Sequence, residues 1–329
     1  MTMNYYFAAA LLTTMIASAN AVGDEPKMTQ ADIKRDGDRT TIVGVPALAW
    51  GKTGETSFCG AFSAALKGMK VDRSYATLMG DSGLAFRMRW WKPDAGAGWC
   101  PSSPVGEFAP WDQRAVRSVG LKLTYHLNLD QKHDLSALAK DIVMSIDAGR
   151  PVLVYPSKMD MGVVYGYEDA GRRLHCRDYY AGDKETIVSL DKSLGLLAFI
   201  TPDVAVPSPR ELAETALHNA VADWSAAPVP SASGGRAGKY LLGDAAYEQW
   251  ITDLEQLNQR PADEQKQLFQ PSWWAFDVLV DARWSAVIYL REIAPLFDGQ
   301  AKAAIEQAAQ HYAESAGTLG RAFAEKNAF

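Results

Sequence analysis

The sequence is poor in the residues that carry metal and redox chemistry, with three cysteines and five histidines among 329 residues. The histidines are scattered, and no cysteine–histidine group has the spacing that zinc sites use. We therefore expect no metal, and nothing in the chain implies an organic cofactor. Because the number of cysteines is odd, at least one thiol stays outside any intrachain disulfide. A bond between Cys59 and Cys100 is one alternative, which spacing alone does not decide.

Positive charge is also scarce, because 33 Lys and Arg residues face 39 Asp and Glu residues, for a formal net charge of -6. The Lys and Arg residues form no cluster, so a nucleic acid or an anionic membrane surface is not an expected partner. The chain also lacks an uninterrupted apolar run of about 20 residues, the length that spans a bilayer. We therefore expect no membrane span.

The N-terminal segment has no charged side chain before Asp24, and the residues from Tyr5 to Ala19 are mostly apolar. Small residues at alternate positions lead to Ala19 and to Ala21, as signal-peptide cleavage requires. The pattern predicts a signal peptide over residues 1–21 that lacks the usual basic start. We expect a periplasmic or secreted protein; the alternative is an N-terminus that is disordered or buried.

The rest of the chain predicts an α+β domain over residues 22–203, followed by an all-α domain over residues 204–329. In the first domain, a helix is expected from about Cys59 to Lys67, and another over residues 135–148 with Asp134 as its N-cap. Consecutive apolar runs at residues 151–155 and 162–167 predict buried strands. A helix followed by several strands favours an α+β fold over a doubly wound one.

The second domain predicts four helices, over residues 210–224, 243–258, 272–293 and 300–325. In the third of them, apolar side chains recur at spacings of three and four, at Trp273, Phe276, Val280, Trp284 and Val287. Such a stripe is typical of a helix face that packs against a core. We therefore predict that these side chains are buried.

Cys59 follows the polar residues Thr56 and Ser57 and precedes an alanine-rich run, so it is expected in the first turn of a helix. Unpaired backbone N–H groups and the helix dipole favour a thiolate there, which points to a nucleophile. Cysteine is also among the most buried residue types, so a small core residue is the alternative.

The chain carries several motifs in a fixed order, namely Cys59-Gly60 on an expected helix, the stretches at residues 80–87, 149–154 and 162–169, and Arg177-Asp178. This order resembles the papain-like cysteine peptidase superfamily. The likeness is greatest to the double-glycine leader-peptidase-like domains and to the N-terminal domain of the butirosin-biosynthesis acyltransferase family, over about residues 46–201. It implies a Cys-bearing helix packed on an antiparallel sheet.

The resemblance implies that Cys59 is the nucleophile and Asp178 the carboxylate that orients a histidine. The family's histidine is expected just before the second apolar strand, where this chain has Asp160. A carboxylate beside Cys59 would raise the thiol pKa, which is the reverse of activation. In place of the family's glutamine before the cysteine, the chain offers Thr53 and Ser57.

Four residues are candidates for substrate binding beside this cleft, namely Ser57, Arg87, Trp99 and Tyr165. Arg87 has an alternative structural role in an ion pair with Glu107. Trp99 belongs to a group of tryptophans that either lines a binding groove or fills a second small core.

Two functions follow from these residues. The first is acyl transfer or amide or peptide hydrolysis through a thioester on Cys59, with a peptide or a small acyl or amide compound as substrate. The second is a catalytically inactive relative without the active-site histidine, which binds a peptide or small ligand in the same cleft. A structural role in an exported complex is a third alternative.

Overall fold

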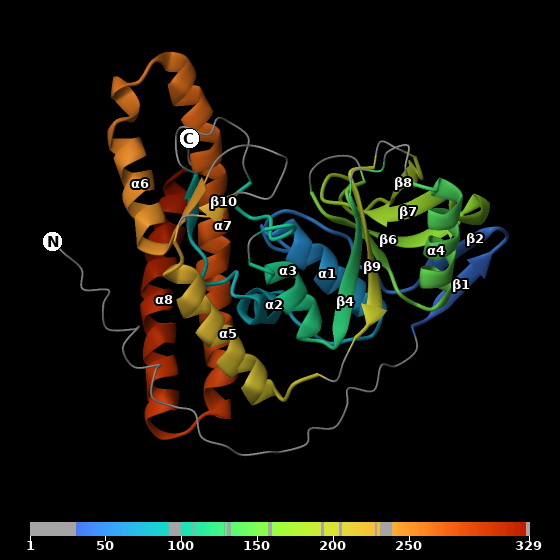
Figure 1. Ribbon diagram of the computed structural model, residues 1–329, viewed down its shortest axis with the longest axis horizontal. Helices are drawn as coiled ribbons and strands as arrows, with labels where there is room; N and C mark the ends of the chain where they lie inside the picture. The colour runs from blue at the N-terminus through green and yellow to red at the C-terminus, as the bar shows by residue number, and fades with distance from the viewer. Residues whose placement is uncertain are drawn as a thin grey trace. The chain divides into compact units, whose positions relative to one another are not determined.

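The computed structural model describes residues 31–91, 100–107, 109–127, 129, 133–156, 160–191, 194–203, 206–227, 229–230 and 239–326 (Figure 1). The predicted signal peptide and Trp99 lie outside the described residues. The chain forms two compact units. The sheet unit comprises Glu25–Leu78 and Ala115–Val206, and the helical unit comprises Met79–Arg114 and Pro207–Phe329.

The described residues form helices and strands in both units. The α-helices are α1 (Ser57–Gly68), α2 (Tyr75–Ser82), α3 (Trp111–Arg117), α4 (Leu135–Asp147), α5 (Pro209–Trp224), α6 (Gly243–Glu255), α7 (Ala262–Ile293) and α8 (Gly299–Lys326). Short 3-10 helices are η4 (Asp169–Gly171), η6 (Leu257–Gln259) and η7 (Ala294–Leu296). The strands are β1 (Ile33–Asp36), β2 (Arg39–Ile42), β3 (Arg89–Trp91), β4 (Leu121–Leu127), β5 (Val152–Val154), β6 (Gly162–Glu168), β7 (Arg173–Arg177), β8 (Thr186–Ser189), β9 (Leu196–Pro202), β10 (Val229–Pro230) and β11 (Lys239–Leu242).

The sheet unit is built on an eight-stranded sheet in the order β1-β2-β6-β5-β9-β4, in which β7 also pairs with β6, and β8 pairs with β7. All its pairings are antiparallel. Helices α1 and α4 pack against the central strands. A mixed architecture of helices and an antiparallel sheet is therefore confirmed.

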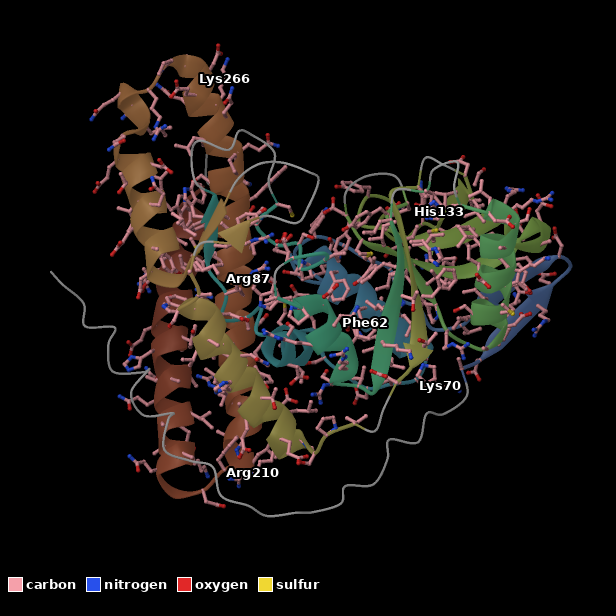
Figure 2. All side chains as sticks on the ribbon, viewed as in Figure 1. Phe62, Lys70, Arg87, His133, Arg210 and Lys266 are labelled. Carbon is pink, nitrogen blue, oxygen red and sulfur yellow. The ribbon has the colours of Figure 1, made fainter. Side chains whose placement is uncertain are left out.

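Helix α1 is buried along almost its whole length, including Phe62, which Figure 2 labels. Its small side chains allow neighbouring elements to approach it from all sides. Helix α4 begins where predicted, because the Asp134 carboxylate accepts hydrogen bonds from the backbone N–H groups of Ser136 and Ala137 at 2.9 and 3.1 Å. This is the ordinary N-cap arrangement.

The helical unit joins two distant parts of the chain. Strand β3 pairs with β11, which pairs with β10, and the guanidinium of Arg283 on α7 donates to the carbonyl oxygens of Ala85 and Arg87 at 3.0 and 3.2 Å. Because of these bonds, residues 79–114 belong with the C-terminal helices. The chain leaves the sheet unit after Val206, near the predicted boundary at residue 203. Residues 79–114 precede this boundary but belong to the helical unit, so a single cut in the chain does not separate the two units.

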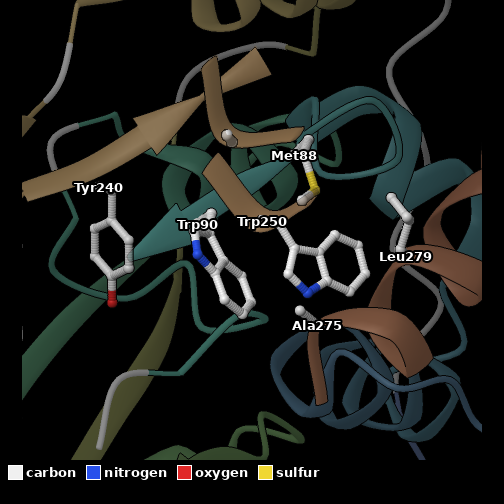
Figure 3. Close-up of a cluster of buried hydrophobic side chains, with 7 residues drawn as sticks. Met88, Trp90, Tyr240, Trp250, Ala275 and Leu279 are labelled. Carbon is white, nitrogen blue, oxygen red and sulfur yellow. The ribbon is translucent and has the colours of Figure 1, made fainter. Parts of the chain in front are cut away.

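A cluster of aromatic and small side chains forms the core between β3, β11, α6 and α7 (Figure 3). The indoles of Trp90 and Trp250 stack with ring centroids 5.4 Å apart. Their N–H groups donate to the Asp253 carboxylate and the Ser272 hydroxyl, both at 2.8 Å. Each buried indole thus has the polar partner that its burial requires.

The predicted apolar stripe of α7 is wrong at two of its residues, because Trp273 and Trp284 are 38% and 46% exposed. Val287 is buried, as predicted. The buried face of α7 is instead built mainly from small or aliphatic side chains, namely Ala275, Leu279, Ala282, Ala286 and Leu290. Close packing against neighbouring elements leaves no room there for two further indoles.

In the described ranges, no helix has both the length and the apolar composition needed to cross a membrane.

Candidate functional site

The N-terminal end of α1 is held by the loop that precedes β6. The helix begins at Ser57, whose Oγ accepts a hydrogen bond from the backbone N–H of Met161 at 3.2 Å. The N–H of the preceding Thr56 donates to the Tyr75 hydroxyl at 3.0 Å. Ser57, a predicted substrate-binding residue, therefore uses its hydroxyl oxygen in a hydrogen bond within the protein.

Cys59 is the third residue of α1 and lies in the sheet unit with its side chain fully buried, at 0% exposure. None of the three cysteines, all of which the structure describes, forms a disulfide. The predicted placement in the first helical turn is therefore correct, and the burial agrees with the alternative of a small core residue. A reactive thiol is partly exposed, whereas buried structural cysteines are inert.

Tyr179 packs against the same turn of α1. Its hydroxyl donates to the Thr53 carbonyl oxygen at 3.5 Å, and its ring stacks on Trp50 with centroids 4.1 Å apart. A Cβ on Gly60 would lie 1.9 Å from the Tyr179 hydroxyl oxygen. Glycine is therefore required at this position, because any side chain would displace Tyr179.

Asp178, the predicted orienting carboxylate, organises the turn that carries Tyr179. Its Oδ1 accepts hydrogen bonds from the backbone N–H groups of Tyr180 and Ala181, each at 2.8 Å, and its Oδ2 accepts one from the Thr186 hydroxyl at 2.7 Å. These bonds use the carboxylate in the way Asp residues commonly stabilise turns. Asp178 thus shapes the turn, and the hydrogen bonds that its carboxylate accepts within the described part of the chain come from Tyr180, Ala181 and Thr186 and not from a histidine.

Asp160 stands where the resemblance places a histidine, and it accepts a hydrogen bond from the Tyr180 hydroxyl. Burial first, and then this bond and the charges of Asp160 and Asp178, raise the pKa of Tyr180 above its usual value. Tyr180 is 48% exposed, and Trp50 is 38% exposed. An aromatic and acidic surface therefore flanks the end of α1.

Two histidines on strands of the sheet unit, His126 and His175, contact other residues. His126 on β4 packs edge-to-face against Phe199, with ring centroids 5.6 Å apart. His175 on β7 is fully buried, with Nδ1 3.0 Å from a Glu185 oxygen and Nε2 3.4 Å from a Glu168 oxygen. His175 is therefore held between two carboxylates, and His126 packs against an aromatic ring.

Tyr165, a predicted substrate-binding residue, belongs to the same polar cluster as His175. It lies at a register shift between β6 and β7, where a bulge redirects side chains. Its hydroxyl donates to Glu185 at 2.8 Å, and the Arg177 guanidinium lies 5.0 Å from its ring centroid. Burial, followed by the bond to Glu185, raises the pKa of Tyr165 to about 12.

Arg87, another predicted substrate-binding residue, belongs to the helical unit and is used structurally. Its guanidinium donates to the carbonyl oxygens of Pro101 and Ser102 at 2.9 and 2.8 Å. Burial is the main reason why its pKa falls to about 9. Glu107, the suggested partner of Arg87, instead lies 3.0 Å from Arg89, and both side chains of that pair are buried.

The structure thus brings Ser57, Cys59, Asp160 and the Asp178 turn to one end of α1, whereas Arg87 and Tyr165 serve other networks. Sequence reasoning missed Tyr179 and Tyr180, although two tyrosines directly after Asp178 were a visible signal. Within the described residues, no group of three or more His, Cys, Asp and Glu side chains is placed to hold a metal ion.

The fold and this site define a mixed α/β protein in which two sheet loops enclose the N-terminal end of a buried helix. Neither a comparison with protein-family models nor one with curated protein sequences finds a match for the chain.

Proposed function

We propose that this chain is an exported papain-like protein that has lost thioester chemistry and binds a peptide or a small ligand at the N-terminal end of α1. The observation that carries the proposal is the complete burial of Cys59 at a helix end whose neighbours are Asp160, Tyr179 and Tyr180.

The papain-like part of the proposal is supported by the order of the elements. The family carries its cysteine on a helix and its other catalytic groups on an antiparallel sheet. Here the loop before β6 contacts Ser57, and the loop after β7 contacts Gly60. These two loops are adjacent because β6 and β7 are paired antiparallel. The positions of the family's histidine and carboxylate would thus correspond to Asp160 and Asp178.

Three features weigh against catalysis through Cys59. The thiol has no exposed surface, so a carbonyl carbon has no path to it. The loop before β6 carries Asp160 at the position that would correspond to the family's histidine, and a carboxylate near a thiol disfavours the thiolate. The carboxylate of Asp178 is used by its own turn. A thiolate–imidazolium pair, the usual source of nucleophilic activation, has no basis in this arrangement.

Ligand binding is supported by the side chains at the surface of the site. Trp50 and Tyr180 each present a substantial part of their rings to solvent, and Asp160 adds a carboxylate acceptor. Rigid aromatic side chains with a polar neighbour provide both contact area and orientation for a ligand. A peptide or a small amide suits this combination, because its apolar groups pack on the rings while its N–H groups donate to Asp160.

Thiol alkylation tests the loss of catalysis. In a Cys100→Ser, Cys176→Ser variant, iodoacetamide should modify Cys59 more slowly than a model thiol at every pH below the onset of unfolding. The same variant in denaturant should react at the rate of a model thiol. If native Cys59 instead reacts faster than the model thiol near neutral pH, the result favours acyl transfer through a thioester on Cys59, and the proposal fails.

A tetrapeptide library, screened by the thermal shift of the purified protein, tests ligand binding. Peptides that stabilise the wild type should lose at least about tenfold in affinity for Tyr180→Ala, which corresponds to about 1.4 kcal/mol. Tyr125→Ala, on β4, is a matched tyrosine control. Ligands bound equally well by both variants would place binding elsewhere.

Export is proposed from the apolar stretch that ends at Ala21. Expression with a periplasmic fractionation step should give a mature chain that begins at Val22 or Asn20 on N-terminal sequencing. A cytoplasmic chain that still begins at Met1 would contradict it.

A further inference from the structure

The hairpin of α6 and α7 exposes a group of large apolar side chains, which we name the hairpin apolar face. It comprises Ile251 and Leu254 on α6 and Phe269 and Trp273 on α7, each between 38% and 59% exposed. The rings of Phe269 and Trp273 lie one helical turn apart, with centroids 6.0 Å from each other. Single exposed apolar side chains need no explanation, but a contiguous group marks an interaction site.

Helix geometry places these four side chains on one side of the hairpin. The hydrogen bond from Trp250 to Ser272 shows that these two residues face each other across α6 and α7. In two antiparallel helices, the residues that follow a facing pair project to the same side. Ile251 and Trp273 are those residues, and Leu254 and Phe269 lie one turn along the same faces. The next residue, Trp274, is rotated by a further 100° and lies off this face.

The hairpin is also the most acidic part of the chain. Residues 243–281 contain eight Asp and Glu residues but only two basic ones, Arg260 and Lys266. Arg260 is held 2.7 Å from the buried carboxylate of Asp253, and Lys266 stands near the tip of the hairpin (Figure 2). Most of the other acids are exposed, namely Asp244, Glu248, Glu255, Asp263 and Glu264. The apolar face therefore lies in a part of the chain where acidic side chains outnumber basic ones, even though Arg260 also lies 3.8 Å from Glu264.

We propose that the hairpin apolar face is the docking surface for a cationic amphipathic helix of a partner protein. Apolar side chains spaced along two helices accept the apolar face of a third helix, and the acidic surroundings attract its Lys and Arg residues. The same charge repels an anionic lipid surface, and it repels the identical face of a second copy of this chain. Charge complementarity thus selects a basic partner.

A synthetic peptide of about 18 residues, or five helical turns, serves as the probe. Its leucines recur at positions i, i+3, i+4 and i+7, and the other positions are lysine. Binding is measured by isothermal titration against full-length protein. A peptide with the same composition in scrambled order, and one with glutamate in place of lysine, are the controls. We expect the wild type to bind the amphipathic lysine peptide at least about tenfold more tightly than either control.

Two tryptophan variants locate the site. Trp273→Ala should weaken binding by about tenfold or more, whereas Trp274→Ala, a neighbour of similar exposure, should leave it within about twofold. Glu248→Gln with Glu255→Gln should weaken binding at low salt and much less at high salt. Circular dichroism confirms that each variant is folded.

Equal binding of all three peptides, or equal loss in both tryptophan variants, overturns the proposal. So does a concentration-dependent dimer that Trp273→Ala disperses, because a second copy would then occupy this face. Binding of anionic vesicles in preference to the peptide would overturn it as well.

Discussion

Glu185 holds together the polar cluster that anchors the far end of the Asp178 loop, and its removal makes a sharp test. Its carboxylate accepts a hydrogen bond from the Tyr165 hydroxyl at 2.8 Å, lies 3.0 Å from His175 Nδ1, and pairs with Arg39 at 2.8 Å. Tyr165 and His175 are buried, whereas Arg39 is partly exposed. Glu185→Ala leaves the two buried groups without this acceptor.

The expected loss follows from those two groups. A buried polar group deprived of its partner costs about 1–3 kcal/mol, and a partly exposed ion pair contributes about 0–1 kcal/mol. The free energy of unfolding should therefore fall by about 2–7 kcal/mol in Glu185→Ala. That is a large share of the roughly 5–15 kcal/mol that stabilises a typical protein. Urea unfolding at pH 7, followed by circular dichroism, measures it.

Two further variants distinguish the loss of the Glu185 hydrogen bonds from a nonspecific loss of stability. Tyr165→Phe should cost less in the Glu185→Ala background than in the wild type, by about 1 kcal/mol, because the hydroxyl has then already lost its acceptor. Glu214→Ala removes an exposed partner of Arg210 and should cost less than about 0.5 kcal/mol. A loss below about 1 kcal/mol in Glu185→Ala, or strict additivity with Tyr165→Phe, would refute the reasoning.

The pH dependence of the same variant has a definite sign. Burial alone would raise the pKa of Glu185, but the hydrogen bonds from Tyr165 and His175 and the charge of Arg39 lower it below 4.5. A lowered pKa means that the carboxylate adds stability above its unfolded-state pKa, and that this stability is lost as the pH falls through the folded-state value. The difference between wild type and Glu185→Ala should therefore shrink below about pH 4.5.

Gly60→Ala should lower the free energy of unfolding by about 1–3 kcal/mol, because the new methyl group collides with the Tyr179 hydroxyl. Gly317→Ala on α8 is the control: its methyl group has room, so this variant should be neutral or stabilising. Both are read from urea midpoints. Ser208→Ala removes the capping box of α5 and should cost about 1 kcal/mol in thermal unfolding, and an unchanged midpoint would refute the cap. Since the pKa of Tyr165 is raised from 10.0 to about 12, its contribution to stability should decline as pH rises between these values, and Tyr165→Phe should flatten that decline.

Features governed by local chemistry could be predicted well. The helix that carries Cys59, and its stop near Gly68, follow from an alanine-rich run bounded by polar residues and glycine. The start of α4 follows from the capping carboxylate of Asp134. The buried strands β5 and β6 follow from continuous apolar runs. Each of these signals acts over a few residues, so no distant contact was needed to read it.

The candidate site could be predicted only in outline, because its function depends on which groups meet. That Cys59 would lie in a first helical turn was a local matter, but its burial depends on distant segments that cover it. The tyrosine after Asp178 reaches α1 only because β6 and β7 pair and carry their loops to the same end. No spacing along the chain encodes that approach.

The sequence by itself determined where most helices lie, that β5 and β6 are apolar and buried, and which residues carry acid or thiol groups. Tertiary structure alone decided that Cys59 is enclosed, that Glu185 gathers Tyr165 and His175, and that Trp273 faces solvent while small residues of α7 face the core. The physical reason is that propensity and capping depend on neighbours in the chain, whereas burial and charge pairing depend on neighbours in space.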